Sequence, residues 1–326
     1  MRIGVSFDGF VTTGEAVALA RRAVAAGARS LWMAEHLGYR EAIATCMAFA
    51  LKAPGAILVP TAVSPYLWHP MPTAMAMATL DEVAPGRVAI AIGAGNPLFL
   101  AESGRAVEKP VRAMREFARA LRALWSGEGV HADGEFVRLA GARLALRPSA
   151  PMPIYIAAIG PDMLRLAGRI GDGVVLSAGL STDSVRRSLA QCAEGACKDN
   201  RELRNFRRAG YLFFGASHDP TEARDAVREK LAFVMRNKFL GANIRASGIA
   251  VDQEAVIAAI ARRDLAAAAA LVPDEAVEAF AIAGTPQHCS TRLRDFIDAG
   301  LDEPVLGLLG SPKNCLLALD VMREFT

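Results

Sequence analysis

Short apolar runs alternate along this chain with longer segments in which apolar residues recur every three or four positions. The short runs are typical of strands buried on both faces, and the longer segments are typical of amphipathic helices. Gly and Pro turns separate most of the runs from the segments that follow them. The predicted strands are residues 3–7, 30–34, 56–62, 88–92, 154–157, 174–176, 209–214 and 304–308.

A predicted helix follows each strand. Thr12 and Glu15 have the spacing of a capping box at the start of the first helix, and Gly27 ends it. Two segments depart from the pattern: residues 127–147 predict a hairpin-like excursion, and the Ala-rich segment 237–275 predicts a helical insertion. The other predicted helices are residues 41–52, 72–83, 111–125, 161–170, 183–198, 220–235, 286–299 and 312–324.

This order of elements predicts an α/β protein, a (β/α)8 TIM barrel with insertions that forms one domain over residues 1–326. A doubly wound sheet is the alternative, and it usually carries a Gly-x-Gly-x-x-Gly turn after a strand. Residues 93–98 read Gly-Ala-Gly-Asn-Pro-Leu, so Leu98 stands in the third glycine position. We also expect Pro97 to disfavour a helix start there, which leaves the barrel as the better interpretation.

Residues 153–176 contain one complete strand–turn–helix–turn–strand unit. Gly160 ends the strand, and Pro161 falls in the first turn of the helix, where its missing N–H costs nothing. Ala157, Ala158 and Gly160 are small, so we expect exposed backbone N–H groups at the carboxyl end of this strand. Because parallel α/β folds bind planar, anionic cofactors at this position, the unit predicts a cofactor site.

Composition narrows the function classes. Hydrophobic residues make up 52% of the 326, enough for a large core, and the net charge is only +3 without a polybasic run, which argues against nucleic acid as a partner. The amino terminus lacks the pattern of a secretory signal, and no apolar run is long enough to span a membrane. We therefore expect a cytoplasmic protein without membrane association. The five cysteines lack metal-ligand spacing, as do the histidines, so we expect reduced thiols and no metal.

Four stretches, taken together, resemble the bacterial luciferase-like superfamily. Residues 30–36 (Ser-Leu-Trp-Met-Ala-Glu-His) are similar to its second-strand signature, and residues 65–70 (Pro-Tyr-Leu-Trp-His-Pro) with 78–82 (Ala-Thr-Leu-Asp-Glu) are similar to its central block. Residues 153–176 match a third block, and Gly284-Thr285-Pro286 with Ala299-Gly300 match the carboxyl-terminal one. Within the superfamily the chain most resembles the methylenetetrahydromethanopterin reductase branch.

The resemblance implies a (β/α)8 barrel and an oxidoreductase. It implies coenzyme F420, a deazaflavin, as the cofactor, with FMN as the alternative, and hydride transfer from the reduced deazaflavin to a small substrate. The best specific expectation is reduction of a methylene-tetrahydropterin or methylene-tetrahydrofolate to the methyl form. An FMN-dependent monooxygenase and a non-catalytic flavin-binding protein remain open as alternatives. Relatives are often oligomeric, so we expect a homo-oligomer.

Four residues at the carboxyl ends of the first two strands are the predicted catalytic residues: Ser6, Asp8, Glu35 and His36. A carboxylate beside an imidazole can hold one tautomer and tune proton transfer, and the resemblance places the Glu35–His36 pair beside the cofactor ring. It also aligns Ser6 with a glutamate of the reductase branch, an acid that serine cannot replace. Asp8 would compensate if its loop turns inward. His69 precedes Pro70, and we expect a structural role for it.

The predicted cofactor-binding residues end the strands around the same rim. The resemblance implies a bulge with a non-prolyl cis peptide at Thr61–Ala62, although family members usually carry Gly at the first position. Phe7, Trp32 and Met33 are expected in the core. The predicted cofactor-binding set is His36, Thr61, Ala62, Gly93, Gly95, Asn96, Ala157, Ala158, Gly160 and Ser177.

Overall fold

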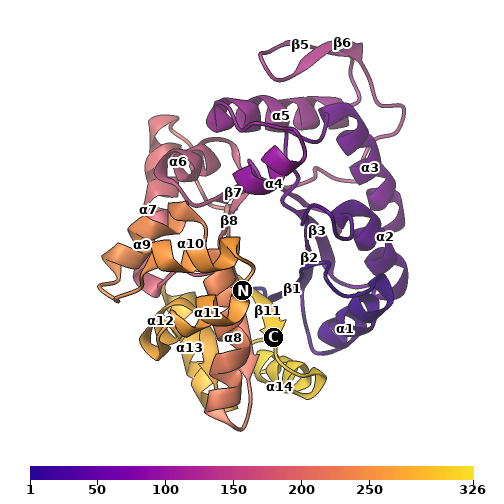
Figure 1. Ribbon diagram of the computed structural model, residues 1–326. Helices are drawn as coiled ribbons and strands as arrows, with labels where there is room; N and C mark the ends of the chain where they lie inside the picture. The colour runs from indigo at the N-terminus through magenta and orange to yellow at the C-terminus, as the bar shows by residue number, and fades with distance from the viewer.

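The computed structural model describes residues 1–326 with the exception of the Leu98 side chain. Eight parallel strands form a ring enclosed by helices (Figure 1), which confirms the predicted (β/α)8 barrel. The strands pair in the order β3-β2-β1-β11-β9-β8-β7-β4. They are β1 (Gly4–Phe7), β2 (Ser30–Ala34), β3 (Ile57–Thr61), β4 (Ile90–Ile92), β7 (Ile154–Ala158), β8 (Gly173–Leu176), β9 (Arg207–Ala216) and β11 (Glu303–Leu309).

The ring closes between β3 and β4 through two isolated bridges rather than a continuous ladder. Leu58 pairs with Val88, and Val63 pairs with Ile92. Between the bridges β3 advances by one residue more than β4, which is the residue count of a β-bulge. The cis peptide between Thr61 and Ala62 lies inside this bulge, where the family resemblance implied it.

An outer layer of helices covers the strands. The predicted capping box of the first helix is confirmed, because the Thr12 hydroxyl accepts a hydrogen bond from the Glu15 N–H while the Glu15 carboxylate accepts one from the Thr12 N–H. The outer helices are α1 (Thr13–Ala25), α2 (Ala42–Lys52), α3 (Pro70–Val83), α5 (Pro110–Trp125), α6 (Pro161–Ile170), α7 (Thr182–Lys198), α13 (Pro286–Asp298) and α14 (Pro312–Arg323).

Side chains alternate along each strand between the barrel interior and the helix layer. Trp32 and Tyr155 fill the interior, where their rings meet edge to face at 5.1 Å between centroids. Phe7 and Met33 belong instead to the core between strands and helices, and all four side chains are buried. The prediction that Phe7, Trp32 and Met33 are core residues is thereby confirmed.

Three local features complete the description of the fold. The predicted hairpin is confirmed as the antiparallel pair β5 (Val130–Asp133) and β6 (Arg138–Ala142). A short helix, α4 (Pro97–Glu102), begins at Pro97, so the expectation that this proline disfavours a helix start is wrong. The first helical position tolerates Pro, because the N–H of a residue at that position has no partner within the helix and its absence in Pro costs nothing. A short strand not predicted from the sequence, β10 (Ile282–Gly284), pairs in parallel with the last three residues of β9.

The segment between β9 and β10 is helical. The helix that packs between α7 and α14 in the outer layer is α13, whereas α8 packs against α10, α11 and α12. These helices gather on one side of the barrel opening (Figure 1). They are α8 (Pro220–Met235), a 3-10 turn at Lys238–Leu240, α9 (Gly241–Ala246), α10 (Gln253–Ala261), α11 (Leu265–Ala270) and α12 (Asp274–Phe280).

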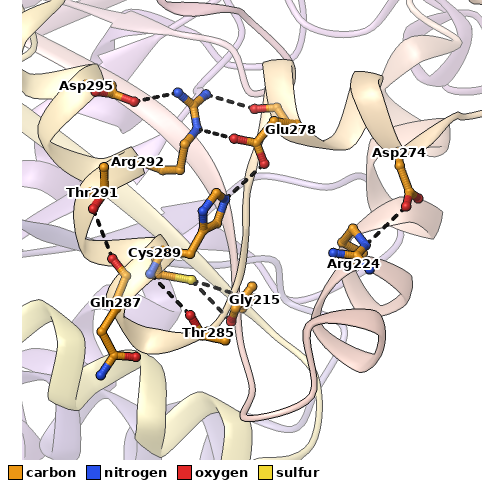
Figure 2. Close-up of polar contacts among 12 residues, drawn as sticks. Gly215, Arg224, Asp274, Glu278, Thr285, Gln287, Cys289, Thr291, Arg292 and Asp295 are labelled. Atoms are coloured by element: carbon orange, nitrogen blue, oxygen red, sulfur yellow. Dashed lines mark hydrogen bonds and ion pairs between the residues drawn. The ribbon is translucent and has the colours of Figure 1, made fainter.

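Polar contacts fasten these helices to the barrel (Figure 2). The Glu278 carboxylate, on α12, lies 2.9 Å from His288 Nε2 and 3.2 Å from Arg292 Nε, both on α13. Arg292 also pairs with Asp295 of its own helix at 2.7 Å. His288, to which the sequence assigned no functional role, therefore contributes to the anchoring of α12.

None of the described helices combines the length and the apolar character that a membrane crossing requires.

Candidate functional site

The carboxyl ends of β3, β4 and β7 form a wall of small residues at the barrel opening. A Cβ atom added to Gly93 would lie 2.8 Å from the Ala62 Cβ and 3.1 Å from the Ala157 Cβ. Contacts below 3.0 Å require a neighbour to move, so the space between Ala62 and Ala157 accommodates only glycine. This close packing leaves main chain and methyl groups as the surface that faces the opening.

His36 follows the end of β2, the strand next to β3. Because side chains alternate every two residues along a strand, we place His36 on the same side as Trp32. Its Nδ1 is 2.8 Å from the carbonyl oxygen of Asp8. A carbonyl oxygen only accepts hydrogen bonds, so Nδ1 donates, and Nε2 is the unprotonated nitrogen of the neutral ring. The Phe10 ring packs against the imidazole, with 5.1 Å between centroids.

Glu35 does not form the predicted pair with His36. Its carboxylate accepts hydrogen bonds from the Ala42 N–H at 2.9 Å and from the Trp68 indole N–H at 3.2 Å. Successive residues of an extended chain point to opposite faces, so Glu35 turns toward the helix layer while His36 faces the interior. Burial raises the pKa of the Glu35 carboxyl group. The tautomer of His36 is set by a backbone carbonyl rather than by this carboxylate.

Asp8 and Ser6 lie on either side of Phe7 at the end of β1. The Asp8 carboxylate forms an ion pair with Lys230 of α8 at 3.1 Å and accepts a hydrogen bond from the Phe10 N–H at 3.1 Å. Lys230 also lies 4.2 Å from the centroid of the Phe10 ring. Ser6 Oγ is 3.4 Å from the Leu306 carbonyl oxygen, beside β11. The acid of the first strand end is thus held by a lysine of α8.

The turn after β4 carries two of the predicted cofactor-binding residues. Gly95 has a φ of 87°, a conformation that favours glycine, and a Cβ there would lie 2.9 Å from Leu100 Cδ1 of α4. Asn96 immediately precedes α4. The structure therefore explains Gly95 by the conformation of the turn, and a role in binding remains a prediction for both residues.

Next to β4 in the same wall, Ala157 belongs to the interior-facing residues of β7, whereas Ala158 is buried in the outer core. Gly160 is the N-cap of α6, without a side-chain cap, and a Cβ added to it would meet nothing within 4 Å. Ser177 follows β8 and donates a hydrogen bond to the Ala178 carbonyl at 3.1 Å. These residues leave free space and backbone N–H groups at the start of α6, which is suitable for an anionic group.

Two further residues at this opening were missed in the sequence. The Tyr211 hydroxyl, from β9, is buried, and burial raises the pKa of this phenol while the Thr61 side chain opposes the rise. Arg236, at the end of α8, stacks on Phe99 of α4, with its guanidinium carbon 4.9 Å from the ring centroid. Tyr211 was detectable as the interior position two residues after Ala209, but the contact of Arg236 depends on how α8 packs against α4.

His69 has the structural role that was expected. Its Nδ1 accepts a hydrogen bond from the Met71 N–H at 3.2 Å, so it caps the amino end of α3. Among the described residues, no three His, Cys, Asp or Glu side chains gather closely enough to share a metal ion.

The small-residue wall, the space at Gly160 and the N–H groups of α6 together fit a flat, anionic cofactor. A planar ring could lie against Ala62, Gly93 and Ala157, where a larger residue would block it. An acidic tail could extend toward the start of α6. His36, with Nδ1 engaged by the Asp8 carbonyl, would then lie at the end of the neighbouring strand β2.

Comparison with known proteins relates the chain to one enzyme family. A family model described as luciferase-like monooxygenase matches residues 1–303. A 5,10-methylenetetrahydromethanopterin reductase from Archaeoglobus fulgidus is 30% identical over 312 residues, which cover 94% of this chain and 93% of that protein. An F420-dependent glucose-6-phosphate dehydrogenase from Beutenbergia cavernae is 34% identical over 213 residues, 61% of this chain and 62% of that protein.

Solved structures share the fold. The coenzyme F420 dependent tetrahydromethanopterin reductase from Methanopyrus kandleri superposes with a TM-score of 0.88 at 24% identity and covers 99% of this chain and 97% of that chain. An F420-dependent secondary alcohol dehydrogenase, in complex with an F420-acetone adduct, superposes with a TM-score of 0.83 at 21% identity and covers 100% of this chain and 98% of that chain.

Proposed function

The chain belongs to the luciferase-like monooxygenase family, and from that premise we propose that it is an oxidoreductase that uses coenzyme F420. The observation that carries the proposal is the close packing of Gly93 between Ala62 and Ala157 at the barrel opening. Such a wall of main chain and methyl groups suits a flat ring system. The two relatives described above, a reductase and an F420-dependent dehydrogenase, support the choice of reaction class.

The residues of this chain would contribute binding and orientation. Ala62, Gly93 and Ala157 would contact the ring, and the N–H groups at the start of α6 would bind the acidic tail. Reduced F420, when bound, supplies a hydride, so the protein needs no nucleophile of its own. Holding the substrate carbon against the ring converts the transfer into a unimolecular step, which is the main contribution of such a site.

His36 is the residue that we assign to proton exchange at the site. Its Nδ1 is committed to the Asp8 carbonyl, so Nε2 is the atom that can accept or return a proton. Ser6 replaces the acid that the family resemblance led us to expect at the first strand, and Asp8 is engaged by Lys230. His36 would therefore act without a carboxylate partner at that strand end.

The substrate that we propose is a methylene-tetrahydropterin or methylene-tetrahydrofolate. Its methylene carbon bridges two nitrogens. It would take the hydride while one of its two C–N bonds breaks, so that it becomes a methyl group on the other nitrogen and the released nitrogen takes a proton. The proposal is supported by the reductase from Archaeoglobus fulgidus, which matches 94% of this chain, whereas the glucose-6-phosphate dehydrogenase matches 61%.

Titration of the purified protein with F420 and with FMN, followed by turnover assays, tests the proposal. We expect binding of F420 and oxidation of the reduced cofactor when methylene-tetrahydromethanopterin or methylene-tetrahydrofolate is added. Tight binding of FMN alone would favour a monooxygenase. Stoichiometric binding of F420 without turnover on either methylene substrate or on glucose 6-phosphate would contradict catalysis and favour a cofactor-binding protein. Ser6, which stands in place of the expected acid, is the feature that favours this alternative.

A further inference from the structure

A second concave region lies at the other end of the barrel. A cleft of about 1130 Å³ is lined by residues at the amino ends of the strands, including Arg2 before β1, Pro153 before β7, Asp172 before β8 and Arg207 at the start of β9. The barrel interior, filled by residues such as Trp32, separates this cleft from the opening described above. It is therefore a different site from the proposed cofactor site.

The cleft carries a concentrated positive charge. Six arginines and two carboxylates, Asp172 and Glu202, line it, so the positive charges exceed the negative ones by four. The excess is larger than the net charge of the whole chain, +3, so the remainder of the protein does not share it. The arginines that line the cleft are Arg2, Arg122, Arg147, Arg201, Arg204 and Arg207.

Part of this charge is used by the fold. Arg122 donates two hydrogen bonds to Asp172, at 2.8 and 3.1 Å, and Asp172 also accepts one from the Ile154 N–H. Arg201 donates to the Gly168 carbonyl at 2.9 Å. Arg204 pairs with Glu202 at 2.7 Å, but this pair is exposed and contributes little.

Arg2 and Arg207 have no such structural use. Within the part of the chain that the structure describes, no hydrogen bond or ion pair involves either guanidinium. Their backbones are fixed, because the Arg2 N–H bonds to the Asp302 carbonyl and the Arg207 N–H bonds to the Asp172 carbonyl. Two charged groups with free donors thus project from rigid positions on neighbouring parts of one cleft wall.

A buried carboxylate nearby does not account for them. Glu303 is only 1% exposed, and its two oxygens accept hydrogen bonds from the Ser30 hydroxyl at 2.6 Å and the Tyr155 hydroxyl at 3.2 Å. Neither arginine comes within ion-pair distance of it. Arg2 and Arg207 act on the Tyr155 phenol only through their charge, which opposes the rise in its pKa that burial and Glu303 cause.

From this geometry we propose that the amino-terminal cleft binds a phosphate-bearing anion with more than one negative charge. Guanidinium groups match phosphate oxygens in pairs of parallel hydrogen bonds, and several of them around one cleft favour a multivalent anion over a single carboxylate. Trp125 and Phe206 add apolar surface to the same cleft. Its volume is sufficient for a nucleotide-sized molecule.

Calorimetric titration of the full chain with inorganic pyrophosphate and with ADP, at low ionic strength, tests this site. We expect saturable binding of both, and we expect the double variant Arg2→Gln, Arg207→Gln to weaken it by at least about 10-fold. Arg186→Gln is the matched control, because Arg186 is an exposed arginine of α7 outside the cleft, and it should leave the affinity unchanged.

Two further measurements keep the proposal testable if the double arginine variant folds poorly. Arg204→Glu reverses a charge on a side chain that is 83% exposed, so it should lower the affinity without disturbing the core. Trp125 is the tryptophan of the cleft wall, so a fluorescence change on binding should disappear in Trp125→Phe. The F420 titration of the double arginine variant should match that of the unmodified protein, which separates this proposal from the proposed function.

The proposal is overturned if neither pyrophosphate nor ADP binds the unmodified chain. It is also overturned if binding occurs but is unaffected by Arg2→Gln, Arg207→Gln and by Arg204→Glu. A fluorescence response that survives Trp125→Phe would place the ligand elsewhere on the molecule and would likewise contradict it.

Discussion

The two ends of the barrel present opposite kinds of surface. At the carboxyl end, Ala62, Gly93 and Ala157 leave little more than main chain exposed, and the charged pair Asp8–Lys230 neutralises itself. At the amino end, arginines line the cleft, and the guanidinium groups of Arg2 and Arg207 have no ion pair or hydrogen bond within the described part of the chain. We propose that the first surface selects a flat ligand by close approach and that the second selects an anion by charge.

This difference predicts which substitutions should weaken ligand binding at each end of the barrel. At Gly93 of the carboxyl rim, adding a single methyl group is a large perturbation, because a Cβ there would lie 2.8 Å from the Ala62 Cβ. At the amino-terminal cleft, volume is available, so removing charge is the effective change. The four predictions below test the first half of this contrast, from the largest expected effect to the smallest.

The largest effect is expected from His36→Asn. The change removes Nε2, the atom that we assign to proton exchange, and should lower kcat by about 100-fold, the lower end of the range for a general acid or base. Steady-state turnover with reduced F420 and the methylene substrate measures it. His69→Asn is the matched control, because asparagine also caps helices well, and its kcat should stay within about twofold. Equal losses in both variants would remove His36 from the mechanism.

The next effect is expected from Gly93→Ala. The new methyl group would lie 2.8 Å from the Ala62 Cβ, so the wall must shift, and we expect F420 affinity to fall by about 10-fold with a loss of about 1–3 kcal/mol in unfolding free energy. Equilibrium titration and urea unfolding measure these quantities. Gly129→Ala, in the hairpin region, meets no atom closer than 4.0 Å and serves as the control. Unchanged F420 affinity in Gly93→Ala would contradict the proposed ring position.

A smaller effect is expected from Asp8→Asn. The ion pair with Lys230 is partly exposed, so its loss should cost less than about 1 kcal/mol in unfolding free energy and should change kcat by less than about threefold. Asp183→Asn removes a comparable surface pair with Arg186 on α7 and provides the reference value. A large drop in kcat for Asp8→Asn alone would show that Asp8 does replace the missing acid of the first strand.

The smallest effect is expected from Glu35→Gln, and it depends on pH. Burial raises the pKa of this carboxyl in the folded state, so its contribution to stability is complete below its ordinary value of 4.5 and is lost as the pH rises through the raised value. The variant lacks this loss, so its stability relative to the unmodified protein should improve as the pH rises above 4.5. Urea unfolding at several pH values measures the trend.

Glu194→Gln gives the opposite sign and therefore a control for this measurement. A hydrogen bond from Arg165 lowers the pKa of Glu194, so its contribution is present above the ordinary value and is lost as the pH falls. Removing Glu194 should make the variant relatively less stable as the pH rises. The same trend in both variants would contradict the assigned environment of Glu35.

Local patterns in the sequence were sufficient for most of the fold. The capping box at Thr12 and Glu15, the hairpin within residues 127–147 and the eight strands were predicted, because each depends on residues close together in the chain. The error at Pro97 was of the same local kind, since a first-turn proline is compatible with a helix start. The short strand β10 escaped prediction because only its pairing with β9 defines it.

The sequence by itself determined that this chain forms a parallel barrel and which residues end its strands, because the alternation and the turn residues act over short distances. Tertiary structure alone decided that Glu35 faces Ala42 and Trp68 while His36 binds the Asp8 carbonyl. It also decided that Lys230 reaches Asp8 and that Arg2 and Arg207 line one cleft. Apart from the Glu35–Ala42 contact, these contacts join residues far apart in the chain, and their geometry arises only when the strands close into a ring.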